Sequence, residues 1–294
     1  MILEGESGDR PSLSVVMGLY DGLPHLVAQL DALAAQVYGG PWETIIVDNG
    51  SRDGSAGVAR SYADRIRSLR VVTATAGRGP SYSRNHAASL ANGEALVFVD
   101  QDDQVAPGYL DAMGAALVQN EFAAARIDHA FLNPEWSPGS RPSWQSEGLM
   151  QTGFLPSASG CSLGMRRLAF ERVGGFDEQF ASAQDIDLCW RAQLIGIQLV
   201  FVPTAVLRYR YREGLLEHFR QERRWGADDV RIFRRYRPVG LPKRSLRGTA
   251  NDWRLLASRM ATARSRREWA WCAGSLGRRL GRLETSVVLR TLYP

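Results

Sequence analysis

Short apolar runs alternate with amphipathic stretches along the first third of the chain. Four of these runs have the length of a strand and are rich in Val, Ile and Leu, at residues 13–17, 44–47, 69–73 and 95–99. Because each run is continuous rather than alternating with polar residues, both faces of each strand are expected to be covered. This order predicts an α/β fold in which a mostly parallel central sheet is flanked by helices.

The segments around these runs are assigned from the spacing of their apolar and turn residues. A helix is expected after Pro24, with one apolar face formed by Leu26, Leu30, Leu33 and Val37. Further helices are expected over 56–67 and from about 83 to 91, and a long loop over 133–159. From Glu213 the chain is predicted to be helical, with a break over 237–246. We therefore expect an α/β domain over 10–212 and a helical extension over 213–294.

The positive charge is concentrated in the C-terminal part of the chain. From Leu207 onward there are 22 basic and 8 acidic residues, a net +14, whereas the first 206 residues have 14 and 23, a net −9. Residues 218–237 interleave arginine with Trp, Phe and Tyr. We interpret this segment as a helical cap with a solvated arginine face, and contact with an anionic membrane surface or a partner is the alternative. Nucleic-acid binding is not expected.

Cysteine content and apolar run lengths bear on the cellular location. Cys161, Cys189 and Cys272 are odd in number and in no CxxC pattern, which predicts reduced, buried thiols. No stretch approaches the roughly 20 apolar residues that span a bilayer, and the opening MILEGESGDR is unlike a secretory signal. The expected location is the cytoplasm, with peripheral contact at the inner face of the membrane as a further option.

An acidic cluster directly follows the fourth apolar run. Asp100 and Asp102 are the outer residues of an extended triplet, so their carboxylates point the same way, about 7 Å apart. Such a pair can hold a hard divalent cation, and Mg²⁺ typically recruits substrate phosphates as further ligands. The alternative is a solvated turn before a helix starting at Pro107. Because ligands collect at the carboxyl ends of parallel strands, the cluster predicts a metal site there.

Two other segments have polar residues that suit a nucleotide. Asp48 and Asn49 end the second apolar run and could bind the edge of a base, although Asn-Gly is also a common turn pair. The glycine-rich stretch GRGPSYSRN places Arg78 and Arg84 before a helix, where they could bind phosphate or be exposed surface residues. The stretch matches neither the P-loop nor the G-x-G-x-x-G pattern.

A later helix, starting near Ala183, has a carboxylate in its first turn. Asp185 is either a general base, ionised at neutral pH, or a charge that stabilises the helix N-terminus. Asp187 and Arg191 are expected to form an i,i+4 pair. The predicted buried stripe of this helix is Ile186, Cys189, Trp190 and Leu194.

The order of these motifs resembles a family 2 glycosyltransferase of the GT-A fold. The series is SVVMGLYDG, IIVDNGSRDGS, SRN, FVDQDD, VGGFDE, QDIDLCWR and FVPTAV, and the resemblance covers about residues 12–210. It implies a nucleotide-sugar half over about 10–105 and an acceptor half over about 106–212. The implied activity is metal-dependent, inverting transfer of a sugar from a nucleoside-diphosphate sugar, UDP-linked by default, to a hydroxyl acceptor.

The resemblance also implies roles for individual residues. Asp185 matches the catalytic base. Asp100 and Asp102 match the metal-binding D-x-D, which would hold Mg²⁺ or Mn²⁺ at the diphosphate. The positions implied for nucleotide-sugar binding are Leu19, Asp21, Asp48, Asn49, Arg78, Arg84, Asp100, Gln101 and Asp102. Those implied for the acceptor and the sugar are Gly160, Cys161, Gln184 and Asp185.

The chain departs from the family pattern at three places. Asp21 stands where Asn is usual, and Gln184 replaces the Glu that commonly precedes the base. Residues 208–211, Arg-Tyr-Arg-Tyr, occupy the region where many relatives have a metal-binding His. The acceptor, described as a glycan, a lipid-linked molecule or a small molecule, is left open, as is the oligomeric state.

Other function classes fit this sequence less well. A catalytically silent sugar-nucleotide or glycan-binding module of the same fold is the alternative to the enzyme. A nucleotidyltransferase would need a glycine-rich loop with a lysine after the first strand, which residues 18–24 lack. Methyltransferases and dehydrogenases would need a glycine fingerprint at the same place. The expected biological role is cell-surface polysaccharide or glycoconjugate biosynthesis.

Overall fold

The computed structural model describes residues 10–23, 25–134, 144–212 and 214–293. The α/β region contains β1 (Leu13–Leu19), α1 (Leu26–Ala34), β2 (Trp42–Asp48), α2 (Ser55–Arg60), β3 (Leu69–Thr73), α3 (Pro80–Ser89), β4 (Ala95–Asp100), β5 (Gln104–Val105), α4 (Tyr109–Gln119), β6 (Phe122–Asp128), β7 (Met150–Gln151), β8 (Pro156–Ser157), η1 (Gly160–Ser162), β9 (Leu163–Arg166), α5 (Arg167–Val173), α6 (Gln184–Leu194) and β10 (Leu199–Arg208). The C-terminal part contains α7 (Leu215–Tyr236), η2 (Arg237–Val239), α8 (Leu246–Thr262) and α9 (Arg266–Val288).

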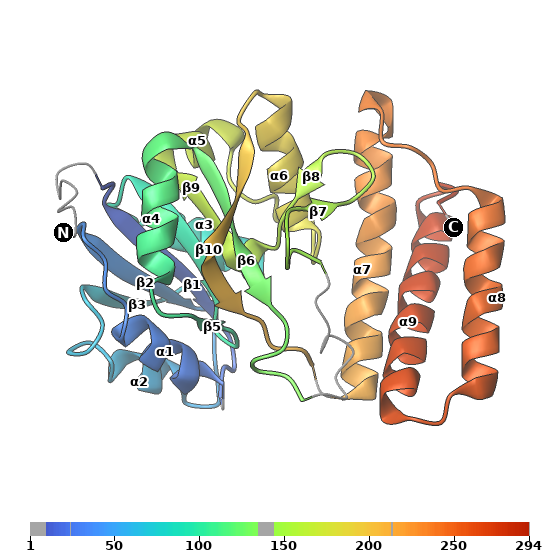
Figure 1. The fold of residues 1–294 in the computed structure, drawn as a ribbon, viewed down its shortest axis with the longest axis horizontal. Helices are drawn as coiled ribbons and strands as arrows, with labels where there is room; N and C mark the ends of the chain where they lie inside the picture. The colour runs from blue at the N-terminus through green and yellow to red at the C-terminus, as the bar shows by residue number, and fades with distance from the viewer. Residues whose placement is uncertain (1–9, 24, 135–143, 213, 294) are drawn as a thin grey trace, which may run out of the picture.

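The central sheet has eight strands in the order β3-β2-β1-β4-β9-β6-β10-β5. Strands β1 to β4 pair in parallel, and so do β6 and β10. Strand β9 runs antiparallel between β4 and β6, and the short β5 pairs antiparallel with β10. Helices flank this sheet on both sides (Figure 1), so the predicted α/β architecture with C-terminal helices is confirmed.

Alternate side chains of the central strands enter two separate hydrophobic cores. Val16, Leu96 and Phe98 belong to one core, which is covered by α3, α5, α6 and α7. Val15, Met17 and Val97 belong to the other, which is covered by α1, α2 and α4. Both faces of the sheet are therefore buried from solvent, and this explains why the strands have continuous apolar runs rather than alternating ones.

Several elements begin or end at residues other than those predicted. Helix α1 ends at Ala34, so Val37 lies beyond it and is 80% exposed, although Leu26, Leu30 and Leu33 are buried as expected; Pro24 is outside the described residues. Helix α2 ends at Arg60 and turns replace the rest of the predicted helix. Helix α3 begins earlier, at Pro80, because proline fits the first helical position.

The long loop and the α6 stripe also differ from the prediction. The described part of 133–159 contains a small hairpin of β7 and β8, and residues 135–143 lie outside the described residues. In α6, Cys189 and Trp190 are buried as predicted, but Leu194 is 50% exposed and Leu188 takes its place in the core. The predicted pair of Asp187 and Arg191 is present at 2.7 Å, and all three cysteines are free and buried.

The three C-terminal helices form a bundle beside the α/β region (Figure 1). Helix α7 joins the two, because its Ile232, Phe233 and Tyr236 enter the same core as Trp190 of α6. Helices α7 and α9 approach closely through glycines: a Cβ at Gly281 would lie 1.9 Å from the Arg223 carbonyl oxygen. No helix among the described residues combines the length and the apolarity needed to cross a membrane.

Candidate active site

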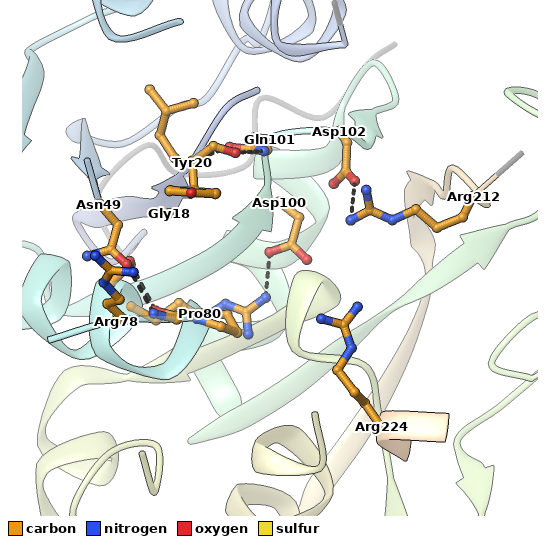
Figure 2. A pocket seen from close by; sticks show the side chains of 14 residues that line it. Gly18, Tyr20, Asn49, Arg78, Pro80, Asp100, Gln101, Asp102, Arg212 and Arg224 are labelled. Carbon is orange, nitrogen blue, oxygen red and sulfur yellow. Dashed lines mark hydrogen bonds and ion pairs between the residues drawn. The ribbon is translucent and has the colours of Figure 1, made fainter. Parts of the chain in front are cut away.

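A cavity of about 480 Å³ lies at the carboxyl ends of β1 and β4, and we call it the strand-end cavity. Figure 2 shows side chains from several segments converging on it. Its lining includes seven of the residues predicted to bind the nucleotide sugar: Leu19, Asn49, Arg78, Arg84, Asp100, Gln101 and Asp102. The parallel pairing of β1 with β2 and β4 brings these segments to one edge of the sheet.

Side-chain amides fix the walls of the strand-end cavity. Gln101 donates to the Tyr20 carbonyl at 2.9 Å and accepts from the Tyr20 N–H at 2.7 Å, which ties the end of β4 to the end of β1. Asn49 donates to the carbonyls of Ala74 and Gly77 and accepts from the Gly79 N–H. Its amide therefore shapes the loop that carries Arg78, in addition to lining the cavity (Figure 2).

Two of the carboxylates predicted to bind the nucleotide do not line the strand-end cavity. They accept hydrogen bonds from backbone N–H groups instead. Asp48 is buried and accepts a hydrogen bond from the Ser51 N–H at 3.0 Å. Asp21 accepts from the Arg52 N–H at 2.7 Å. Both contacts stabilise the loops that follow β1 and β2. Direct contact of Asp21 and Asp48 with a nucleotide stays a prediction.

The acidic cluster is surrounded by arginines. Asp100 forms an ion pair with the buried guanidinium of Arg84, and Asp102 faces Arg212 at 3.7 Å (Figure 2). Burial raises the pKa of Asp102, and Asp100 raises it further, while Arg212 lowers it. Asp103 is buried behind this pair and accepts from the Arg210 N–H, and burial raises its pKa well above the ordinary value.

The donor atoms of the cluster suit a hard divalent cation. Asp100 and Asp102 both reach the strand-end cavity, and the second Asp103 oxygen is buried with no hydrogen-bond partner among the described residues. Ligand atoms of Asp100, Asp103 and Cys161 lie within 4.8 Å of one another. Carboxylate oxygens are the ligands that Mg²⁺ and Mn²⁺ prefer, whereas a thiol is a soft ligand. The carboxylates therefore fit such an ion, and Cys161 does not.

Asp185 lines a second cavity, of about 580 Å³, which we call the α6 cavity. Its carboxylate accepts from the Gly160 N–H at 3.0 Å and the Ile186 N–H at 2.8 Å. Burial raises the pKa of Asp185, although these hydrogen bonds and the nearby Arg84 oppose the change. A partly buried carboxylate with a raised pKa, held at a helix N-terminus, can accept a proton from a bound hydroxyl group.

Arg84 and Gly160 stand between the two cavities. Arg84 is 3% exposed and forms an ion pair with Asp100. Its positive charge also interacts electrostatically with Asp185 and lowers the pKa of that carboxyl group. A Cβ at Gly160 would lie 2.8 Å from Arg84 Nη1. One buried guanidinium thus connects the two cavities, because it pairs with Asp100 and lies against Gly160, whose N–H donates to Asp185.

The remaining predicted residues of the acceptor region lie behind the cavity walls. Cys161 is buried, with its sulfur 3.3 Å from Ser159 Oγ. Gln184 is buried at the start of α6, and its Oε1 has no hydrogen-bond partner in the described part of the chain. Their roles in binding an acceptor or a sugar stay predictions.

Helix α7 fixes the position of Asp185 from outside the α/β region. Its buried Asp228 accepts hydrogen bonds from the Ser182 N–H at 2.7 Å, the Ser182 hydroxyl at 2.8 Å and the Ala183 N–H at 3.3 Å. These groups directly precede α6. The side chain of Asp228 therefore anchors the segment that carries the predicted base.

Sequence reasoning missed several residues of both cavities. Arg212 and Arg224 line the strand-end cavity (Figure 2), and Trp225 lines the α6 cavity together with Trp144 and Tyr209. Arg224 and Trp225 belong to the segment 218–237, which the sequence analysis interprets as a helical cap with a solvated arginine face. No local signal marks Arg224 and Trp225, because Trp253 and Arg254 are also adjacent in the same extension.

The family model described as glycosyl transferase family 2 matches residues 14–174, more than half of the chain. The O-antigen biosynthesis protein RfbC of Myxococcus xanthus is 28% identical over 211 residues, covering 70% of this chain and 16% of that protein. The pre-mycofactocin glycosyltransferase of Mycobacterium tuberculosis is 24% identical over 284 residues, covering 91% of this chain and 53% of that protein. The chain thus spans about half or less of the length of these relatives.

Solved structures share the fold at low sequence identity. The mannosyltransferase PcManGT of Pyrobaculum calidifontis, in complex with GDP-Man and Mn²⁺, has a TM-score of 0.63 at 18% identity, with 95% of this chain and 88% of that chain covered. Residues 1–349 of TarS from S. aureus, in complex with UDP-GlcNAc, have a TM-score of 0.58 at 18% identity, with 96% and 93% covered.

Proposed function

The chain belongs to glycosyl transferase family 2 and has the GT-A fold, and we propose that it is an inverting glycosyltransferase. It would move a sugar from a nucleoside-diphosphate sugar to a hydroxyl acceptor. The observation that carries this proposal is that Asp100 and Asp102 line one cavity and Asp185 lines another, and that Arg84 pairs with Asp100 and lies against Gly160, the hydrogen-bond donor to Asp185.

In the proposed reaction, Asp185 is the general base. The acceptor oxygen attacks the anomeric carbon and its proton passes to the Asp185 carboxylate. The bond between that carbon and the diphosphate oxygen breaks, and its electron pair stays on the departing nucleoside diphosphate. Attack opposite the leaving group inverts the anomeric centre. Because Asp185 acts as its anion and its pKa is raised by burial, transfer is expected to fall as the pH drops through that raised pKa.

The arginines of the strand-end cavity would offset the charge of the diphosphate. Arg78, Arg84, Arg212 and Arg224 all line it. The Nη1 group of Arg84 is buried and has no hydrogen-bond partner among the described residues. A buried donor that lacks a partner is costly, so a phosphate or sugar oxygen would satisfy it.

Asp100 and Asp102 are the residues that would hold Mg²⁺ or Mn²⁺. The ion would supply positive charge that stabilises the departing diphosphate. Asp102 is the better placed of the two, because its arginine partner is 3.7 Å away whereas Asp100 is paired with a buried guanidinium. The Mn²⁺ in the PcManGT complex supports a divalent ion in a protein of this fold.

The α6 cavity is the proposed acceptor site. Trp144, Tyr209 and Trp225 line it, and aromatic rings offer the flat apolar surfaces on which sugar rings pack.

The name of the M. xanthus relative supports a role in making cell-surface polysaccharide or another glycoconjugate. UDP is the proposed default nucleotide of the donor sugar, supported by the UDP-GlcNAc in the TarS complex. A cytoplasmic location, inferred from the free cysteines, stays a proposal.

The test combines donor binding with transfer. UDP- and GDP-linked sugars are added with and without Mn²⁺ or Mg²⁺, and thermal unfolding is followed. The true donor at about 100 times its Kd should stabilise the chain by roughly 2.7 kcal/mol. Asp102→Asn should remove the metal-dependent part of this effect. Asp185→Asn should keep donor binding but lower transfer by about a hundredfold to ten-thousandfold.

A matched control and an alternative outcome complete the test. Asp64→Asn removes an exposed carboxylate outside both cavities and should change neither binding nor transfer. The catalytically silent binding module is the second candidate, and the arginines that already neutralise Asp100 and Asp102 favour it. Donor stabilisation without transfer to any acceptor, unchanged in Asp185→Asn, would support that module and contradict the enzyme.

A further inference from the structure

One end of the C-terminal bundle combines an apolar cavity with arginines. Helix α7 starts at this end, α8 finishes there and α9 starts there (Figure 1). A cavity of about 350 Å³ opens among the three helices, and every residue that lines it is apolar or a cysteine. We call this region the amphipathic end. Its apolar part comprises Leu215, Leu216, Phe219, Met260 and Trp269, and its basic part comprises Arg259, Arg264 and Arg267.

The apolar side chains of the amphipathic end are open to solvent. Leu216 is 56% exposed, Trp269 is 43% exposed, and Leu215 and Met260 are each 39% exposed. Exposed patches of large apolar side chains mark surfaces that bind another protein, a ligand or a membrane. Tryptophan is also the side chain enriched where an apolar phase meets water.

The charge around this apolar surface is mostly basic, although the exposed Glu217 lies in the first turn of α7. Residues 259–267 contain four arginines and no acidic residue. Arg259 lies over the Trp271 ring at 5.8 Å, and Arg267 lines a neighbouring hollow with it. The nearest acid in sequence, Glu268, is engaged in the α9 capping box, where it accepts from the N–H groups of Arg264 and Ser265. An arginine rim around apolar side chains is complementary to anionic headgroups above an acyl layer.

We propose that the amphipathic end docks on the surface of a lipid bilayer that contains anionic lipids. Leu216 and Trp269 enter the boundary between headgroups and acyl chains, and Arg259, Arg264 and Arg267 contact the lipid phosphates. Phe219 and Arg224 are five residues apart on α7, about 8 Å along the helix axis. Docking therefore holds both cavities close to the bilayer, because Arg224 lines the strand-end cavity and the adjacent Trp225 lines the α6 cavity, where an acceptor carried on a lipid would bind. This inference does not depend on the proposed sugar transfer.

The experiment is co-sedimentation of the full chain with vesicles, without any donor sugar. Vesicles of phosphatidylcholine alone are compared with vesicles that also contain phosphatidylglycerol, at low and high salt. We expect binding to the anionic vesicles that weakens with salt. Leu216→Glu with Trp269→Glu should lower partitioning by at least about tenfold. Arg264→Gln with Arg267→Gln should lower it by about fivefold for each arginine.

The control lies at the opposite end of α9. Val287 and Val288 are each 77% exposed, more than any apolar side chain of the amphipathic end named above. Val287→Glu with Val288→Glu should leave vesicle binding unchanged, and all variants should unfold at the temperature of the unaltered chain. Equal loss in this control, or full binding by the Leu216 and Trp269 variant, overturns the proposal. Self-association that requires Leu216 and Trp269, without vesicle binding, would assign the surface to a second copy of the chain.

Discussion

At the scale of single residues, Arg84 decides how the candidate site is arranged. Its guanidinium is buried, pairs with Asp100 and carries a charge that acts on Asp185, although these carboxylates lie far apart in the sequence. Burial alone would lower the pKa of Arg84, but Asp100 outweighs it and the pKa is raised. Arg84 therefore stays charged between the two cavities, and whatever moves it alters both.

Gly160→Ala tests this arrangement by a single methyl group. The new Cβ would lie 2.8 Å from Arg84 Nη1 and 3.2 Å from its Cζ, so the buried guanidinium must shift away from residue 160, and its ion pair with Asp100 is disturbed. We expect transfer to fall by about a hundredfold, as small misplacements in a site can cause. Gly39→Ala is the control, because nothing lies within 4 Å of its added Cβ. Equal transfer by both variants in a steady-state assay would show that the position of Arg84 is unimportant.

At the scale of elements, α7 links the two cavities to the C-terminal bundle. It provides Arg224 to the strand-end cavity, Trp225 to the α6 cavity and Asp228 to the start of α6. It also packs on α9, where Asp229 accepts two hydrogen bonds from Arg278 at 2.9 Å and pairs with Arg282 at 2.6 Å. Burial would raise the pKa of Asp229, but these arginines outweigh it and lower the pKa.

The close contact of α7 and α9 predicts the effect of Gly281→Ala. A Cβ there would lie 1.9 Å from the Arg223 carbonyl oxygen, so the two helix backbones must separate. The variant should lose about 1–3 kcal/mol of unfolding free energy, measured in urea, because overpacking outweighs the better helix propensity of alanine. Gly57→Ala in α2 has open space around its Cβ and should be neutral or slightly stabilising. A Gly281→Ala variant as stable as Gly57→Ala would contradict the predicted clash.

At the scale of the whole molecule, the α/β region and the C-terminal extension share one core. Tyr236 of α7 lies with its ring 4.9 Å from that of Trp190 and donates a hydrogen bond to Asp187 at 2.7 Å. Ile232 and Phe233 of the same helix are buried in the core that covers one face of the sheet. A boundary at residue 212 separates the regions in the sequence, but the hydrophobic core runs across it.

Truncation after residue 212 is therefore expected to prevent cooperative folding. The fragment would expose the core surface around Trp190 and leave Asp187 without the Tyr236 hydrogen bond. Circular dichroism during heating should show no sharp transition, whereas the full chain should unfold cooperatively. Phe233→Ala in the full chain is a milder test, and it should lower the free energy of unfolding by about 3–5 kcal/mol. A fragment that melts sharply at the temperature of the full chain would show that the region folds independently.

Local pattern alone determined the first four strands, the α/β class and much of the strand-end cavity, but not β5, β6, β9 and β10. Continuous apolar runs mark strands buried on both faces, and the polar residues that end parallel strands must meet at one edge of the sheet. Asp100, Asp102 and Asn49 were found in this way, and all three line the cavity. Periodicity failed at Val37 and Leu194, because the spacing continues past the point where tertiary packing ends.

Only the tertiary structure decided which charged side chains pair with one another and which residues of α7 line the two cavities. The partners Arg84 and Arg212 of the acidic cluster, and the α7 residues Arg224, Trp225 and Asp228, come from distant segments. Nothing in the local sequence separates Arg224 from the other arginines of the extension. The physical reason is that the partner of a charged side chain depends on how helices pack in three dimensions, and residue spacing along the chain does not encode that packing.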